Sequence, residues 1–163
     1  MVGERAHSGD RDETPAEQAD RNFTDLLQEL RVSQTGVQFL FAFLLILAFQ
    51  TRFAEIGEFD SAVYVVTILC CAAATIFLIA PVAVHRAMFA RRRKAEVVQV
   101  SARYAKVGLA CLALSMVGAL LLALDAAISR SWAITLSVLV ALAIVVVWLV
   151  HPHVLARRSE ERS

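Results

Sequence analysis

The ten residues HRAMFARRRK, at positions 85–94, decide how this chain is organised. They are the most basic stretch of the sequence, and a pair of long apolar runs lies on each side of them. This arrangement is typical of two membrane hairpins joined by a basic connection. Connections rich in Lys and Arg remain on the cytoplasmic side of a membrane, so the positive-inside rule predicts that residues 85–94 are cytoplasmic.

The composition supports a membrane protein over a soluble one. The chain has 163 residues, of which 58% are hydrophobic and 19% are charged, whereas a soluble domain carries about 25% charged residues. The charges gather outside the apolar runs. No aromatic-basic binding pattern accompanies the basic stretch, so we interpret it as a determinant of topology, and we expect no nucleic-acid partner.

Four apolar runs are close to the length of about 20 residues that a helix needs to cross a bilayer. We expect spans at 32–51, 62–84, 107–124 and 133–150. The two short connections between paired spans carry one arginine each, Arg52 and Arg130, as external loops should. The fold class is therefore an all-α polytopic membrane protein with four transmembrane helices. We expect it in the plasma membrane with both termini cytoplasmic.

The chain ends differ from this four-helix domain, which we place at 32–155. Residues 1–21 are polar and predict a disordered cytoplasmic tail, because they could not bury enough surface to fold. Apolar residues recur at helical spacing over 22–31, which predicts a short amphipathic helix in the membrane interface. Residues 156–163 form a second cytoplasmic tail.

Small side chains recur at every fourth position in three spans, a spacing that lets membrane helices approach closely. These stripes, together with the adjacent Gly108 and Gly118, predict the surfaces that face the bundle interior or a partner. Their members are Thr67, Cys71 and Thr75; Cys111, Ser115, Ala119 and Ala123; and Ala133, Ser137 and Ala141.

Polar residues concentrate at the inner ends of the first two spans. Arg31, Gln34 and Gln38 share one helix face, and we group them with His85 and Arg86 as a candidate inner-rim contact site. Such a rim could bind a partner or anionic head groups, or it could form hydrogen bonds between helices of one bundle. Four further cations are expected to attract anionic lipid: Arg91, Arg92, Arg93 and Lys94.

The middle of each span lacks Asp, Glu, Lys, Arg and His, the groups that ion-coupled transporters carry at that depth. Asp125 lies at the outer edge, where it could couple an ion or pair with Arg130. We find no nucleophile–base–acid set and no phosphate-binding loop, so we expect neither an enzyme nor a cofactor. The three cysteines, Cys70, Cys71 and Cys111, are expected to be free thiols, and no metal site is expected.

Several short stretches carry a family resemblance over about residues 25–124. They are ELRV (29–32), GVQFLFAFLL (36–45) with Arg52-Phe53, and Ala80-Pro81 with His85-Arg86 and Phe89. Together they resemble a bacterial family of small integral membrane proteins of unknown function, common in actinobacteria. Some members are labelled sodium/proton antiporters, a label that the lack of a mid-membrane carboxylate here argues against.

These observations predict a non-enzymatic accessory or interaction component of the bacterial inner membrane. Besides the lipid bilayer, its expected partner is either further copies of the chain or a larger membrane protein. A small oligomeric transporter remains the alternative, in which the ion path would lie between subunits.

Overall fold

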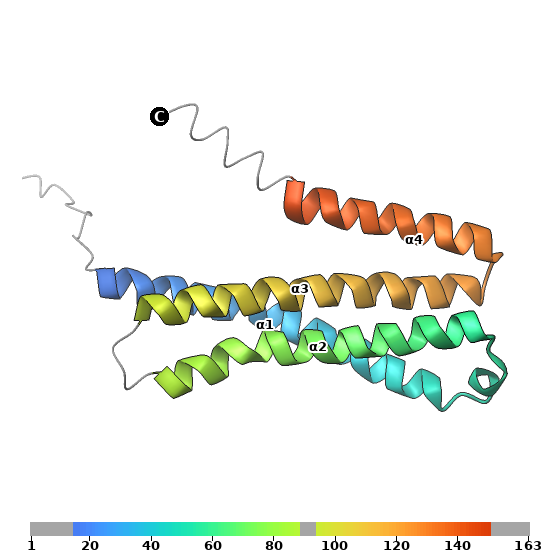
Figure 1. Cartoon of the computed structure of the whole chain (residues 1–163), viewed down its shortest axis with the longest axis horizontal. Coiled ribbons are helices and arrows are strands. Elements are labelled where there is room, and N and C mark those ends of the chain that lie inside the picture. The colour runs from blue at the N-terminus through green and yellow to red at the C-terminus, as the bar shows by residue number, and fades with distance from the viewer. Residues whose placement is uncertain (1–14, 89–93, 151–163) are drawn as a thin grey trace, which may run out of the picture.

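The computed structural model describes residues 15–88 and 94–150, and all regular structure in these two segments is helical (Figure 1). Four long helices carry runs that are long and apolar enough to cross a membrane: Thr24–Ala48, Glu58–Val84, Val98–Asp125 and Arg130–Trp148. The elements are α1 (Pro15–Ala48), the 3-10 helix η1 (Thr51–Glu55), α2 (Glu58–Met88), α3 (Lys94–Asp125), α4 (Arg130–Val145) and the π-helical turn η3 (Val146–Val150). The predicted fold class is thus confirmed.

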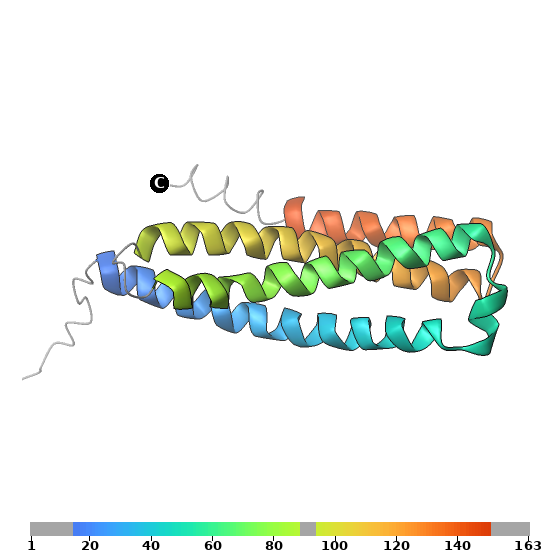
Figure 2. The same cartoon turned by 60° about the horizontal axis from the view of Figure 1, so that its bottom comes forward.

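Helix α3 lies at the centre of the bundle. Figure 1 shows α2 on one side of α3 and α4 on the other. Helix α1 packs against both α2 and α3, and Figure 2 shows it along the edge of the bundle. The most extensive packing is between α2 and α3, and α4 packs mainly against α3. The small residues Ala133 and Ser137 form the buried contact face of α4, so the fourth helix is held chiefly along one narrow stripe.

Two glycines let α2 and α3 approach closely. A Cβ atom added at Gly108 would lie 2.8 Å from Cγ of Leu78, and one added at Gly118 would overlap Oγ1 of Thr67. The buried stripe continues through Cys71 and Ser115, each with no exposed surface. These contacts confirm that the small-residue surfaces of the second and third spans face one another. Ala123, at the end of its stripe, is instead exposed.

The first helix differs from the expectation. The sequence predicts a tail to residue 21 and a separate interfacial helix over 22–31, whereas α1 is continuous from Pro15 to Ala48. Leu30, Val37 and Leu44 are all buried at a spacing of seven residues. The same face of α1 therefore contacts the bundle on both sides of Arg31, where the sequence changes from polar to apolar. Residues 1–14 and 151–163, where most of the tails were predicted, lie outside the described residues.

The first three helices are longer than a membrane is thick. At 1.5 Å per residue, the 34 residues of α1 and the 32 of α3 extend about 51 and 48 Å, against a hydrocarbon core of about 30 Å. The helical residues outside the apolar runs lie at the end where α2 finishes and α3 begins. We name this the Arg86 end and the opposite one the Asp60 end.

Tyr64 has a different role from the interfacial anchor that its position suggests. It is buried, its hydroxyl donates a hydrogen bond to the carbonyl oxygen of Leu44 at 2.9 Å, and its ring meets that of Phe53 edge-on. The side chain therefore joins α2 to the last turns of α1. Trp132, by contrast, is 65% exposed, as an interfacial anchor would be.

Candidate functional site

The glutamines of the predicted inner rim have different surroundings. Gln34 is partly buried, and its Nε2 donates a hydrogen bond of 2.7 Å to the carbonyl oxygen of Leu78 in α2. That carbonyl lies in the turn before Pro81, which lacks an N–H and so interrupts the backbone hydrogen bonding of α2. The carbonyl that loses its backbone donor to Pro81 is that of Phe77, four residues earlier, so Gln34 bonds to the adjacent carbonyl in the same turn. Gln34 therefore acts between helices within the chain.

Gln38 lies deeper and faces outward. The preceding residue, Val37, is buried, and its carbonyl oxygen accepts a hydrogen bond from the thiol of Cys71, near the middle of the second span. Gln38 itself is exposed. It belongs to the same helix as Arg31 and Gln34, but its amide is at mid-span depth and does not share the environment of either one.

At the Arg86 end, cations from three helices are exposed at similar depths. Arg31 lies on α1, Arg86 on α2, and Arg103 and Lys106 on α3. We call these four residues the cationic rim. The contact of Leu78 with Gly108 and the bond from Gln34 to Leu78 align the three helices, and this alignment puts the four cations within about two helical turns of one another.

The rim extends the set predicted from the sequence. Arg103 and Lys106 were not included there, because only the antiparallel pairing of α2 and α3 brings them level with Arg86. Asp25 and Glu29 are exposed on α1 nearby, so the α1 part of this surface carries both signs of charge. The side chains of His85 and Lys94, and all of Arg91, Arg92 and Arg93, lie outside the described residues.

At the Asp60 end, one arginine joins three helices. The guanidinium of Arg130, which begins α4, contacts Asp60 of α2 at 3.0 Å and Asp125 of α3 at 2.9 Å. A second hydrogen bond runs from Nε of Arg130 to Asp125 at 3.2 Å, and the guanidinium lies 4.6 Å from the ring centroid of Phe59. The predicted pairing of Asp125 with Arg130 is confirmed, and Asp60 is an additional partner.

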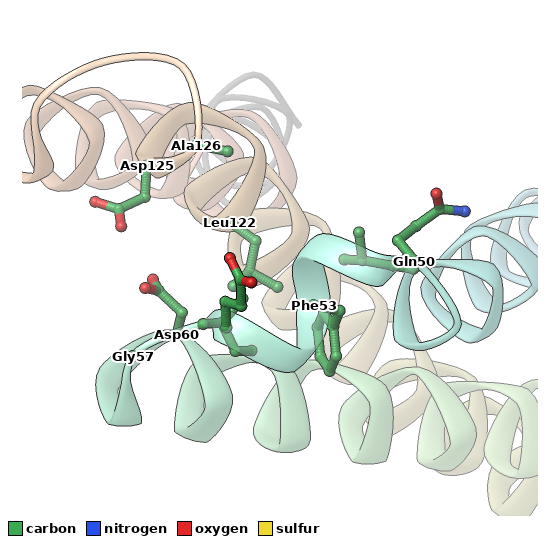
Figure 3. Close-up of a pocket in the computed structure, with 10 residues that line it drawn as sticks. Gln50, Phe53, Gly57, Asp60, Leu122, Asp125 and Ala126 are labelled. Atoms are coloured by element: carbon green, nitrogen blue, oxygen red, sulfur yellow. The ribbon is translucent and has the colours of Figure 1, made fainter.

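A pocket lies beside this Arg130 cluster (Asp60, Asp125 and Arg130), as Figure 3 shows. Its volume is about 330 Å³. The end of α1, η1 and the facing ends of α2 and α3 surround it, with Leu47, Phe53 and Leu122 as apolar walls. Glu55, Asp60 and Asp125 also line it, and the carboxyl groups of Asp60 and Asp125 point toward one another. The pocket is thus acidic, and Arg130 neutralises part of its charge.

Within residues 15–88 and 94–150, no group of three or more His, Cys, Asp or Glu side chains is placed to hold a metal ion. The three cysteines are free thiols, as predicted, with Cys71 fully buried between helices.

Comparison with known protein families now adds to this geometry. Residues 12–152 match a family described as Family of unknown function (DUF6328). The chain belongs to this family. The match covers all four long helices, the cationic rim and the Arg130 cluster, so both ends of the bundle lie within the family's extent.

Comparisons with curated protein sequences and with solved structures gave no match. The family description assigns no activity.

Proposed function

We propose that this protein is a non-enzymatic accessory or interaction component of the membrane, which acts through its surface. The observation that carries the proposal is the cationic rim, four exposed cations contributed by three helices at one end of the bundle. Arg86 lies just past its apolar run, and Arg31, Arg103 and Lys106 lie within the first nine residues of theirs. A Lys or Arg near an anionic membrane surface contributes about 1 kcal/mol of attraction. The rim therefore favours anionic head groups and acidic partner surfaces.

The packed interior supports a surface role. Gly108 against Leu78 and Gly118 against Thr67 leave no space for a further methyl group between α2 and α3. Cys71, Ala74, Leu78 and Ser115 have no exposed surface. With no ionisable residue in the middle of any apolar run, a single copy offers neither space nor charge for a mid-membrane ion path.

The proposed orientation puts the Arg86 end in the cytoplasm of a bacterial cell, because basic connections remain on that side. Cysteines introduced at Ala127 and at Arg86 test it with a membrane-impermeant maleimide. Labelling of intact cells at Ala127→Cys, and at Arg86→Cys only after permeabilisation, agrees with the proposal. The reverse pattern contradicts it.

The rim itself is tested by native mass spectrometry of the protein released from bilayers that contain anionic and zwitterionic lipids. We expect the double variant Arg31→Gln/Arg86→Gln to retain fewer anionic lipids than the natural chain, because two cations are removed. Glu58→Gln, an exposed charge at the opposite end, is the control and should retain the natural number. Equal retention in all three proteins would refute the rim as a contact site.

The acidic pocket keeps one alternative open, namely a small oligomeric transporter that uses Asp125. Its carboxylate lines a pocket and faces that of Asp60. If the alternative holds, sodium- or proton-dependent flux into liposomes will be measurable and will disappear in Asp125→Asn. Under the surface role, liposomes with the natural chain and with the variant show the same background leak.

A further inference from the structure

We infer that a second copy of this chain binds along α1, with the Gln38 side chains of the two copies hydrogen-bonded to each other in the middle of the membrane. The inference rests on the proposed interaction role and names one partner and its contact surface. It depends on Gln38, which the cationic rim does not include.

The side-chain amide of Gln38 faces outward from the bundle near the middle of the first span. Val37 contacts Cys71 in the middle of the second span, and Gln38 follows Val37. From Gln38 to the end of α1 at Ala48 is about 15 Å along the helix, half of a hydrocarbon core. Arg31, seven residues earlier, lies about 10 Å away along the helix, so the Gln38 amide is inside the apolar run on both sides.

Within the described parts of the chain, the Gln38 amide has no hydrogen-bond partner. Gln34, one turn earlier, bonds to Leu78, and the hydroxyls of Thr35, Thr67 and Thr75 each bond to a carbonyl four residues back on their own helix. An amide in hydrocarbon without a partner is unfavourable, because no water replaces the lost hydrogen bonds. Gln38 thus needs a partner from outside the described parts of the chain.

The residues around Gln38 form a surface suited to another helix. Exposed positions recur at alternating steps of three and four residues, the heptad spacing along which two helices pack at a small crossing angle. This α1 seam consists of Thr35, Gln38, Ala42, Leu45 and Phe49, all exposed. Thr35 and Ala42 are small and flank the amide, so a neighbouring backbone can come close to it.

A second copy fits the seam because every copy is inserted in the same orientation. Two such copies are related by a twofold axis along the membrane normal, which puts each residue of the seam opposite itself. A glutamine amide both donates and accepts, so two facing Gln38 side chains satisfy one another. Arg31 lies one turn beyond the seam, where its long side chain can turn toward the head groups.

The affinity of the full-length chain for itself tests the pairing. Energy transfer between labelled copies in liposomes, measured over a range of protein-to-lipid ratios, gives the dissociation constant. Because interhelical hydrogen bonds in membranes contribute about 1–2 kcal/mol in peptides, we expect Gln38→Leu to weaken association about tenfold. Gln38→Asn keeps the amide and should retain most of the affinity, and Gln34→Leu, altered on the inward side, should leave it unchanged.

Disulfide cross-linking tests the contact surface. In a chain whose natural cysteines are replaced by serine, Ala42→Cys should form a cross-linked dimer in the membrane. Phe43→Cys is a matched control at the same depth, 69% exposed and turned by about 100° around the helix, and should not cross-link. Cross-linking at Phe43 as strong as at Ala42, an unchanged affinity in Gln38→Leu, or a monomer at every protein density would each overturn the inference.

The cationic rim can be judged separately. Arg31→Gln/Arg86→Gln should change lipid retention and leave self-association near its natural value. Gln38→Leu should do the opposite. Loss of self-association in the rim variant together with unchanged lipid retention would contradict both proposals, whereas failure of the Gln38 tests alone would leave the rim proposal intact.

Discussion

Adding one methyl group at Gly118 should destabilise the fold, and the structure sets the size of the effect. The new Cβ would overlap Oγ1 of Thr67 and lie 3.1 Å from both Cβ and Cγ2 of that residue. Thr67 is buried and its hydroxyl is bonded to the carbonyl of Val63, so it has little freedom to move. Overpacking of this kind costs about 1–3 kcal/mol, and we expect Gly118→Ala to lose that much unfolding free energy.

At Gly36, by contrast, an added methyl group should cause no steric overlap. It lies inside α1, and a Cβ added there meets nothing within 4 Å. Alanine forms helix more readily than glycine by about 1 kcal/mol in water, so Gly36→Ala should be neutral or slightly stabilising. The two glycine-to-alanine changes are thus expected to have different signs, which separates steric overlap from helix propensity.

The assay is unfolding of the purified protein in one mild detergent, followed by circular dichroism at fixed detergent concentration. A double-mutant cycle with Thr67→Ala adds the decisive comparison, because Thr67→Ala removes Oγ1, the overlapping atom, and Cγ2. The double variant should recover most of the stability lost in Gly118→Ala. If Gly118→Ala is as stable as Gly36→Ala, or if Thr67→Ala gives no recovery, the close crossing of α2 and α3 is refuted.

Three further changes test individual contacts. Tyr64→Phe removes the hydrogen bond to Leu44 and should lower the unfolding free energy by about 1 kcal/mol in the same assay, so unchanged stability would rule that bond out as a contributor. Gln34→Leu, which leaves the Leu78 carbonyl beside Pro81 without its side-chain donor, should speed hydrogen exchange in the last turns of α2, and natural exchange rates would contradict this. Arg130→Gln removes the ion pairs of α4 with Asp60 and Asp125 and should speed proteolysis of the connection between α3 and α4, whereas Arg130→Lys should be cleaved more slowly than Arg130→Gln. Equal cleavage of the natural chain and both variants would refute the ion-pair contact.

The four helices could be predicted because each apolar run is long enough to cross a membrane and ends at charged residues. Residues 96–106, which precede the third span, have amphipathic helical spacing, and in the structure they belong to α3, which begins at Lys94. The small-residue stripes correctly indicated where α2 and α3 meet. Residue spacing within one helix is enough to predict these contact surfaces, because two helices approach closely only where their side chains are small, whichever helix is the partner.

The spacing of residues did not predict that α1 is one continuous helix. The change from polar to apolar at Arg31 marks a change of surroundings, and it was interpreted as the boundary between two helices. Because α2 and α3 pack against α1 on both sides of Arg31, a polar outer face coexists there with a buried inner face at Leu30.

The features at the two ends of the bundle depend on pairing between distant segments. Asp60 meets Arg130 across 70 positions of sequence, and only the fold brings Arg103 and Lys106 to the level of Arg86. Similarly, Gln34 and Gln38 share a helix face by spacing, yet the position of α2 gives a partner to Gln34 and leaves Gln38 exposed. Helical periodicity predicts which residues share a face of one helix. It does not predict which part of that face the neighbouring helix covers.

The central claim, that this protein acts by binding at its surface, is tested most directly by the mass of the native complex. The tagged full-length chain would be released from its own membrane in a gentle detergent and weighed by native mass spectrometry. We predict a mass above that of one chain, made up of a second copy, retained anionic lipid or a stoichiometric membrane partner, with lipid or partner reduced in Arg31→Gln/Arg86→Gln. A bare monomer that carries out ion flux in liposomes, abolished by Asp125→Asn, would contradict the claim.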